Sequence, residues 1–266
     1  MLARPTPIVR TIDSVKQPEM DLLAEEAPLE IRLIFGPKDY RKEKSLSVTM
    51  RTPGDDHHLT LGFLFTEGMV DSPSEILEIR HCEQTHVEAR GNVIKVSMHP
   101  DWNWPQHSME RNFYTTSSCG VCGKSSIESI HSRCSFPISP LNFEEEILGE
   151  LPEKLRAAQI AFKHTGGIHA SALFNNLGII QSVAEDVGRH NALDKIIGKA
   201  FINHQLPISQ NILLVSGRLS FELVQKAATA GISVIAALGA PSSLAVELAK
   251  KMNIKCYGFV KEKRWN

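Results

Sequence analysis

The chain has 266 residues, and its 29 lysines and arginines almost balance its 30 aspartates and glutamates, which leaves a net charge of −1. This balance argues against general nucleic-acid binding, which needs a basic face to neutralise phosphates. No apolar run approaches the ~18 residues of a membrane span, and residues 1–10 lack the apolar core of a secretory signal. We therefore expect a cytoplasmic protein that binds neither nucleic acid nor membrane.

The first half of the chain is typical of a small α+β unit. Residues 1–27 are expected to form a loose arm, because prolines stand at positions 5, 7 and 18. A helix capped by Asp55 or Asp56 should run to Glu67, with Gly68 stopping it. Alternating or β-branched patterns indicate the strands. They are predicted at residues 29–35, 45–51, 76–82, 85–89 and 93–98, with a turn at 91–92 between the last two.

The second half alternates between strands and helices. One long helix is predicted over residues 143–161, followed by a tight loop at 165–169 and a hairpin of strands 171–174 and 179–184. The remaining strands are predicted at residues 212–215, 234–237 and 254–260. The remaining helices are predicted around residues 193–201 and at 221–230 and 243–252. This alternation predicts a parallel or mixed sheet with helices on both faces.

Two strand-to-helix loops are candidates for ligand binding. One is Ser216-Gly217-Arg218 and the other is residues 239–243. Ligands of such sheets bind beyond the carboxyl ends of the strands, where helix-start amides and an arginine suit phosphate. The tail adds Lys261, Lys263 and Arg264. We expect a phosphate-bearing or nucleotide-bearing ligand, the alternative being ordinary turns with capping serines.

Residues 185–191, Glu-Asp-Val-Gly-Arg-His-Asn, place many polar groups at another strand-to-helix junction. One interpretation is a capping loop whose charges satisfy one another. The other is a rim that faces a ligand, with Arg189 and His190 as donors. The sequence leaves both interpretations open.

Cys119 and Cys122 form a C-x-x-C motif, with a glycine after each thiol and Lys124 close behind. Five cysteines scattered through a long chain fit a reducing compartment, where such a pair is more often redox, metal-binding or catalytic than structural. Positive charge or a helix start lowers a thiol pKa and favours the nucleophilic thiolate. The pair therefore allows a redox dithiol, half of a metal site or a sulfur carrier.

A metal site is disfavoured, because structural zinc needs four ligands and usually two such pairs. A zinc deaminase requires H-x-E followed by P-C-x-x-C. Here His169 is followed by alanine and serine, the C-x-x-C lies upstream of it, and Ser118 stands in place of the proline. We therefore expect neither deamination nor a tightly held metal.

Long motifs spread over residues 51–264 resemble the formate dehydrogenase accessory sulfurtransferases, the FdhD family. They are the segments 51–56, 62–68, 117–124, 165–170, 185–195, 216–218 and 241–245. The resemblance implies a three-layer α/β/α cytidine-deaminase-like domain, residues 116–266, behind a smaller α+β domain, residues 1–115. The C-x-x-C loop would lie at the junction.

The same resemblance implies a function. The chain would take sulfur from a cysteine desulfurase as a persulfide and pass it to the molybdenum bis(guanine dinucleotide) cofactor, bound as a substrate, for formate dehydrogenase. Cys119 matches the family's persulfide carrier, and Cys122 is the second thiol. The rival interpretation is a non-catalytic cofactor chaperone, and either allows a homodimer. The residues expected to bind the cofactor are Phe259, Val260, Lys261, Glu262, Lys263 and Arg264, together with Ser216, Arg218 and Arg189.

Overall fold

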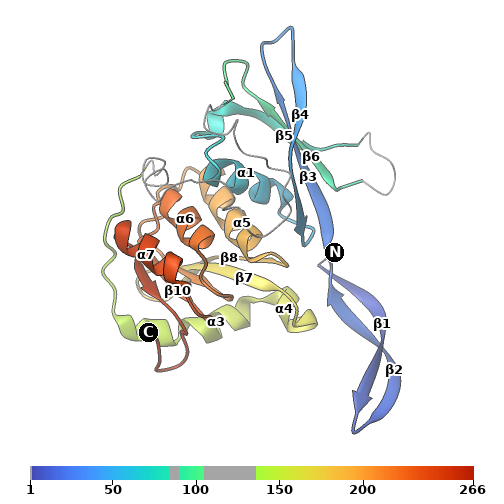
Figure 1. Ribbon diagram of the computed structural model, residues 1–266, viewed down its shortest axis with the longest axis vertical. Coiled ribbons are helices and arrows are strands. Elements are labelled where there is room, and N and C mark those ends of the chain that lie inside the picture. Colours follow the sequence, from blue (N-terminus) through green and yellow to red (C-terminus); the bar gives the residue numbers. More distant parts are fainter. Residues whose placement is uncertain (1, 84–89, 105–135) are drawn as a thin grey trace.

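The computed structural model describes residues 2–83, 90–104 and 136–266. Three sheets and the helices that pack on them make up this part of the chain (Figure 1). The strands are β1 Ala3–Ile12, β2 Val15–Ala24, β3 Ala27–Phe35, β4 Lys42–Arg51, β5 Ile76–His81, β6 Val93–Met98, β7 His169–Phe174, β8 Ile180–Asp186, β9 Ile212–Val215, β10 Val234–Ala237 and β11 Lys255–Tyr257. The α-helices are α1 Asp56–Thr66, α3 Leu151–Ala158, α4 Ile160–Thr165, α5 Arg189–Ile202, α6 Phe221–Thr229 and α7 Ser243–Lys251.

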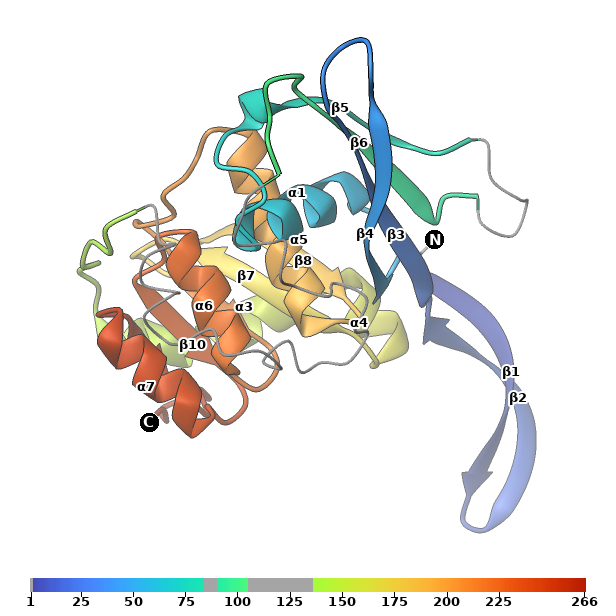
Figure 2. The ribbon, with the colours of Figure 1, turned by 45° about the horizontal axis from the view of Figure 1, so that its top comes forward.

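The first two strands form an antiparallel hairpin, so the prediction of a loose N-terminal arm is wrong. Asp13 and Ser14, both with positive φ (49° and 65°), make the two-residue turn between them. A two-stranded ribbon has an open edge on each side, where a proline's missing N–H breaks no ladder bond. Prolines at 5, 7 and 18 are therefore compatible with strands here. The hairpin projects from the body of the molecule (Figures 1 and 2).

The four-stranded sheet has the order β4-β3-β6-β5, with β3 and β6 parallel and the outer pairs antiparallel. Its strands match four of the predicted ones to within three residues, and the predicted strand 85–89 lies outside the described residues. Helix α1 begins and ends within one residue of the prediction, and Gly68 follows it with a φ of 68°. This region confirms the α+β pattern expected of the first half.

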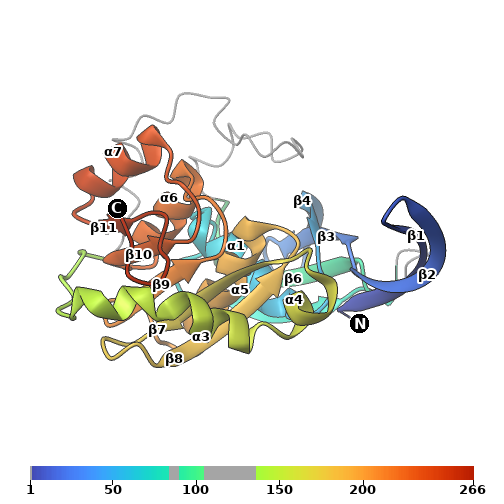
Figure 3. The same cartoon turned by 90° about the horizontal axis from the view of Figure 1, so that it is seen from below.

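The five-stranded sheet is mixed, in the order β11-β10-β9-β7-β8, with β7 antiparallel to both of its neighbours. Alternate residues of its strands face two apolar clusters. Leu148, Leu151 and Leu155 cover one face against Ala170, Ala172 and Leu214. Helices α5, α6 and α7 cover the other face (Figure 3). The predicted sheet with helices on both faces is confirmed.

The single helix predicted over residues 143–161 is wrong, because this segment is broken twice. A 3-10 turn over Glu145–Gly149 precedes α3, which has Pro152 in its first turn, where a missing N–H is tolerated. Gln159 then adopts an extended conformation (ψ 96°), and α4 begins after it. The Glu185 carboxylate accepts the N–H groups of Ala161 and Phe162, both at 2.8 Å, and so fixes the new helix start.

Helices α1 and α5 cross at backbone contact and join the two sheets. A Cβ at Gly62 would lie 1.9 Å from Asp194 O, and one at Gly198 would lie 1.9 Å from His58 O. Only glycine allows this approach. One apolar cluster runs from the four-stranded sheet through these helices to the five-stranded sheet. The predicted domain boundary at residues 115 and 116 lies outside the described residues and stays a prediction.

Candidate functional site

Two glycine loops meet at the carboxyl ends of β9 and β10. Gly239, after β10, donates its N–H to Gly217 O at 3.1 Å, and a Cβ on Gly239 would lie only 2.9 Å from Arg218 N. Phe259, at the start of the tail, donates its N–H to Gly239 O at 3.1 Å. These contacts bring Arg218 and Phe259 to the edge of the sheet at which ligands of such folds bind.

Gly217 also touches the start of β7 and the start of α5. A Cβ there would lie 3.4 Å from two atoms of the His169 ring and 3.7 Å from Arg189 Cδ. Ser216 is tied to β7, because its hydroxyl accepts the Ala170 N–H and its own N–H donates to Ala170 O, both at 2.9 Å. The structure thus gathers four predicted residues, Ser216, Arg218, Arg189 and Phe259, around two adjoining loops. We call this place the strand-end crevice.

The two acidic residues that precede α5, Glu185 and Asp186, form hydrogen bonds and an ion pair with other groups of the protein. Glu185 caps α4, as described above. Asp186, with no exposed surface, lies 2.8 Å from Lys195 Nζ and accepts the Thr52 N–H at 3.2 Å. Lys195 Nζ also donates to the carbonyls of Thr52 and Glu185, both at 3.1 Å. These groups satisfy one another, as the capping interpretation expects.

The later polar residues of the motif are also engaged. Asn191 Nδ2 donates to Met50 O at 2.8 Å and to Asp186 Oδ1 at 3.0 Å. Asp194 accepts Lys226 Nζ on both carboxylate oxygens at 2.9 Å. We call the buried contacts of residues 49–52 with Asp186, Asn191 and Lys195 the polar seam. It joins the end of β4 to the start of α5.

Arg189 is the exception in this motif. It is half-buried, its Nε is enclosed without a hydrogen-bond partner, and no carboxylate of the described residues forms an ion pair with it. Arg218 is exposed and likewise has no ion pair in the described part of the chain. Burial and the Arg189 charge lower the pKa of His169. The crevice therefore holds positive charge that is available to an anion.

His190 is neutral at physiological pH. Burial, followed by the charges of Arg189 and Lys226, lowers its pKa to about 4. Its Nε2 lies 3.3 Å from the hydroxyl of Ser220, the residue before α6, and 4.0 Å from Glu222 Oε2. Ser220 caps no amide of its own helix with its side chain. Sequence reasoning did not select Ser220, and a serine at a helix start was the only available signal.

The tail divides into two parts. Phe259 is 41% exposed and has a φ of 53°, a left-handed conformation that is uncommon for a bulky residue. Val260 is buried and donates its N–H to Ala237 O at 3.0 Å. Lys261 and Arg264 then pair their backbones in a turn, and the N–H of Lys263 lies against Gly149. The side chains of Lys261, Glu262, Lys263 and Arg264 are exposed.

A cleft of about 500 Å³ opens on the other side of His190. One wall is strand β4 at Ser47–Met50 with Leu59 and Phe63 of α1, and the other is the first turns of α5 and α6. The pair of Asp194 and Lys226 lies at its back. His190, one of the two donors named for a ligand-facing rim, lines this cleft, whereas none of the residues expected to bind the cofactor does.

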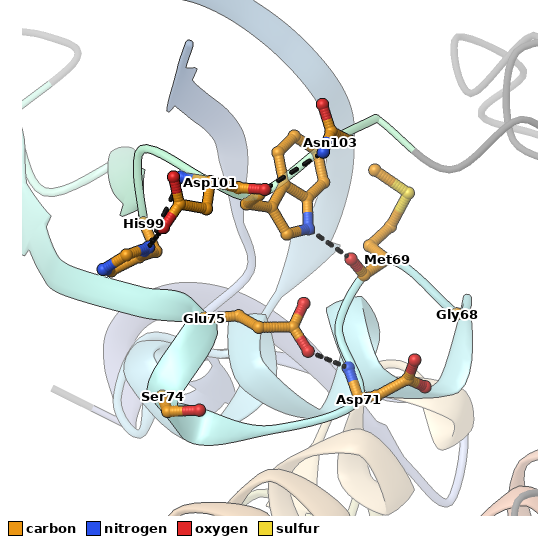
Figure 4. Close-up of a pocket in the computed structure, with 9 residues that line it drawn as sticks. Gly68, Met69, Asp71, Ser74, Glu75, His99, Asp101 and Asn103 are labelled. Atoms are coloured by element: carbon orange, nitrogen blue, oxygen red, sulfur yellow. Dashed lines mark hydrogen bonds and ion pairs between the residues drawn. The ribbon is translucent and has the colours of Figure 1, made fainter. Parts of the chain in front are cut away.

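A second hollow of about 530 Å³ lies between residues 68–75 and 99–103 (Figure 4). Its polar groups mostly bind one another. Trp102 Nε1 donates to Met69 O at 2.9 Å, and the Asp71 N–H donates to Glu75 Oε1 at 3.0 Å. None of the residues expected to bind the cofactor lines this hollow, and the candidate site is the crevice.

Cys119 and Cys122 lie outside the described residues, so their predicted roles stay predictions. Within residues 2–83, 90–104 and 136–266, no group of three or more histidine, cysteine or acidic side chains is arranged to hold a metal ion. Among the helices described, none has the length and hydropathy needed to cross a bilayer.

Comparison with known proteins identifies the family. The profile of the FdhD/NarQ family matches residues 24–266. This chain belongs to the FdhD/NarQ family. A relative from Streptomyces coelicolor named sulfur carrier protein FdhD is 45% identical over 264 residues, which are 97% of this chain and 91% of the relative. One of the same name from Saccharolobus solfataricus is 39% identical over 97% of this chain and 93% of that one.

A solved structure extends the likeness to the fold of this FdhD/NarQ member. It is that of a protein from Desulfotalea psychrophila described as a formate dehydrogenase accessory protein. It superposes with a TM-score of 0.73 and covers 100% of this chain and 96% of the other. At 24% identity, this likeness supports the α/β fold alone.

Proposed function

We propose that the chain is a sulfur carrier that moves sulfur from a cysteine desulfurase to the molybdenum bis(guanine dinucleotide) cofactor, which formate dehydrogenase then receives. The observation that carries this proposal is the pair Arg189 and Arg218. They have no ionic partner among the described residues, at the strand ends of a chain whose relatives are named sulfur carrier proteins. In the same region, the other charged groups of the motif are engaged internally.

The first step is a transfer between thiols. The Cys119 thiolate attacks the outer sulfur of the donor's persulfide, the donor's S–S bond breaks, and the donor cysteine leaves as a thiolate. Cys119 then carries Cys-S-SH, with no net oxidation or reduction. Cys122 is the second thiol of the loop, and its attack on the persulfide would release hydrosulfide and form a Cys119–Cys122 disulfide. That disulfide would need an external thiol reductant before the next cycle.

The crevice is the proposed seat of the substrate cofactor. Guanidinium groups bind phosphate through paired N–H donors, so Arg189 and Arg218 are suited to the dinucleotide phosphates. The exposed ring of Phe259 offers a flat apolar surface against which a guanine base can stack. The basic tail, with Lys261, Lys263 and Arg264, adds longer-range attraction. We expect guanine diphosphates to bind more tightly than adenine diphosphates, which calorimetry measures.

Sulfur loading tests the proposal directly. Incubation with a cysteine desulfurase and cysteine, followed by intact-mass and peptide mass spectrometry under non-reducing conditions, should show one added sulfur on the peptide that contains Cys119. Cys119→Ala should abolish this gain. Cys256→Ala is the matched control, because this half-buried thiol in β11 has a pKa raised by burial and should play no part. Loading that persists in Cys119→Ala would refute the nucleophile assignment.

The second candidate function is a cofactor chaperone that binds the pterin dinucleotide and delivers it without carrying sulfur. The same unpaired arginines favour it, since binding alone requires them. Nucleotide binding without any sulfur gain would support the chaperone, and both together would support the carrier. Formate dehydrogenase is the expected recipient in either case, and a cysteine desulfurase is the expected partner only of the carrier.

We also infer that the five-stranded half is cytidine-deaminase-like and forms a domain of its own from residue 116. The order β8-β7-β9-β10-β11, with β7 alone reversed and helices on both faces, supports three layers. The smaller domain would be residues 1–115. Limited proteolysis with mass spectrometry tests the split, since a domain boundary at residues 115 and 116 should be cut first.

A further inference from the structure

The cleft beside His190 has one largely apolar wall and one polar wall. Val48 of β4 and Leu59 and Phe63 of α1 supply apolar side chains on the first, and His190 and Glu222 stand on the second, at the starts of α5 and α6. The volume of about 500 Å³ lies in the range of small-molecule sites, which combine apolar walls with a few polar groups. Such a cleft suits a flat ring with a polar edge.

The charges at the back of this cleft are paired. Lys226 Nζ donates to both carboxylate oxygens of Asp194 at 2.9 Å and lies 3.6 Å from Glu67 Oε1. One ammonium group therefore faces two carboxylates, and among the described residues no other lysine or arginine lines the cleft. The surplus of negative charge disfavours a phosphate inside the cleft and favours N–H donors.

Glu222 is a carboxylate of this cleft without a cationic partner among the described residues. It lies 4.0 Å from His190 Nε2, but burial and neighbouring cations lower the pKa of His190 to about 4, so this imidazole is neutral at physiological pH. The Glu222 side chain is 26% exposed, whereas Glu26, which also lines the cleft, is exposed to water. A carboxylate that is largely enclosed and unpaired gains most from donors on a ligand.

The chemistry of a single carboxylate selects the ring. A 2-amino-4-oxo heterocycle, as in guanine and pterin, presents a ring N–H beside an amino N–H, and each can donate to one carboxylate oxygen. Adenine presents an unprotonated ring nitrogen on the corresponding edge, and a carboxylate cannot donate to it. An alkylammonium group would match the charge but would leave the apolar wall at Leu59 and Phe63 uncovered.

The first turn of α5 lies between this cleft and the strand-end crevice. Arg189 faces the crevice, where a Cβ on Gly217 would lie 3.7 Å from its Cδ, and His190 lines the cleft. The two residues are consecutive, so their Cα atoms are ~3.8 Å apart. A ligand whose phosphates lie at Arg189 can therefore extend a ring past His190 to Glu222. The opposite charges of the two places orient it in this direction.

We propose that the cleft is a ring-binding subsite beside the crevice, in which the Glu222 carboxylate accepts the paired N–H groups of a 2-amino-4-oxo heterocycle, guanine or pterin. The inference deepens the proposed function and rests on it, because the substrate proposed there carries both kinds of ring. A bis(dinucleotide) has several rings, so one can stack on Phe259 while another enters the cleft. Glu222 then supplies the selectivity that arginines and a phenyl face lack, since these bind any nucleotide.

The ring preference of the full chain tests this proposal. Quenching of pterin fluorescence measures the affinity for 6-hydroxymethylpterin, and competition measures that for 6-hydroxymethyllumazine, which has a carbonyl in place of the 2-amino group. The wild type should prefer the pterin by about 10-fold or more, because the lumazine loses a hydrogen bond to a charged group. Glu222→Gln, which keeps the size of the side chain, should weaken pterin binding by about 10-fold and abolish the preference. Circular dichroism should show an unchanged fold.

Nucleotides distinguish the two sources of the ring. Inosine diphosphate differs from guanosine diphosphate only by the missing 2-amino group, and calorimetry compares the two. A preference for the guanine nucleotide that Glu222→Gln abolishes would assign the cleft to guanine. A preference confined to the pterin and lumazine pair would assign the cleft to pterin. Either result supports the subsite.

The matched control is Glu247→Gln, which removes an exposed carboxylate from α7, outside the lining of the cleft. It should keep the preferences of the wild type. A wild type without preference for either amino-bearing ring, a preference that persists in Glu222→Gln, or an equal loss in the control would overturn the proposal. Sulfur loading of the wild type, measured separately, reports on the proposed function. Ring preference without loading would leave the subsite in place and remove the carrier, and loading without ring preference would do the reverse.

Discussion

The polar seam and the strand-end crevice share one continuous motif, residues 185–195, and charge is handled in opposite ways in the two regions. In the seam, Asp186 and Lys195 are buried and fully paired with each other and with the backbone at Thr52. In the crevice, Arg189, six residues before Lys195 on the same helix, has no such partner in the described chain. Charges that hold a fold together are compensated within it, and a charge left uncompensated is available to a ligand.

The largest effect should come from breaking the seam. Lys195→Met would leave the Asp186 carboxylate, with no exposed surface, buried beside an uncharged side chain. Removing one partner of a buried ion pair costs ~3–5 kcal/mol. Urea unfolding should show that loss at neutral pH. Lys199→Met, which removes an exposed charge from the same helix, is the control and should change stability by less than ~0.5 kcal/mol. Equal stability of the two variants would mean that the seam is not structural.

His190 stands between the two regions and sharpens the comparison through pH. Its folded pKa of about 4 lies below the unfolded value near 6.5, so the unfolded chain binds more protons between these values. Stability therefore falls as pH decreases through this window. Between pH 7 and pH 5 the wild type should lose about 2 kcal/mol more than His190→Gln, which cannot titrate.

Urea unfolding of both proteins at the two pH values measures that difference. His164→Gln serves as the control, because His164 is exposed on α4 and its removal should leave the pH dependence of the wild type intact. If His190→Gln lost as much stability as the wild type on acidification, His190 would not be held neutral by burial and its cationic neighbours.

Much of the five-stranded half could be predicted because its signals are local. The strands Ile212–Val215 and Val234–Ala237 are short apolar runs between glycine or serine loops, and the structure reproduces both boundaries. The break at Gln159 could not be predicted in this way. It depends on Glu185, which lies 24 residues after Ala161 along the chain and reaches α4 only in the folded protein. The N-terminal hairpin was missed because proline is read as a strand breaker, although an isolated ribbon tolerates it.

The candidate site shows the same limit. Sequence reasoning could place Arg189, Arg218 and the tail near strand ends, because the alternation of strands and helices fixes where such loops gather. It named Arg189 and not Lys195 as a donor, but the sequence holds no physical signal that separates them, since both are basic residues on one helix and only their tertiary partners differ. In the structure, Glu185, Asp186 and Asn191 of this motif bind other groups of the protein, whereas Arg189 lies at the crevice. Each of the two interpretations of the motif is therefore right for some of its residues.

The smallest change in stability, and the one that tests the crevice most directly, is expected from Arg189→Gln. The side chain lacks an ionic partner within the described chain, so its loss should cost less than ~1 kcal/mol of unfolding free energy. Hydrogen bonds to a charged ligand contribute ~1.5–3 kcal/mol, so affinity for guanosine diphosphate should fall by about 10-fold or more in calorimetry. Lys199→Gln removes the same charge from the far end of α5 and should leave affinity unchanged. A loss of stability without a loss of affinity would move Arg189 from the crevice to the seam, and the two regions would then no longer differ in the way that their geometry indicates.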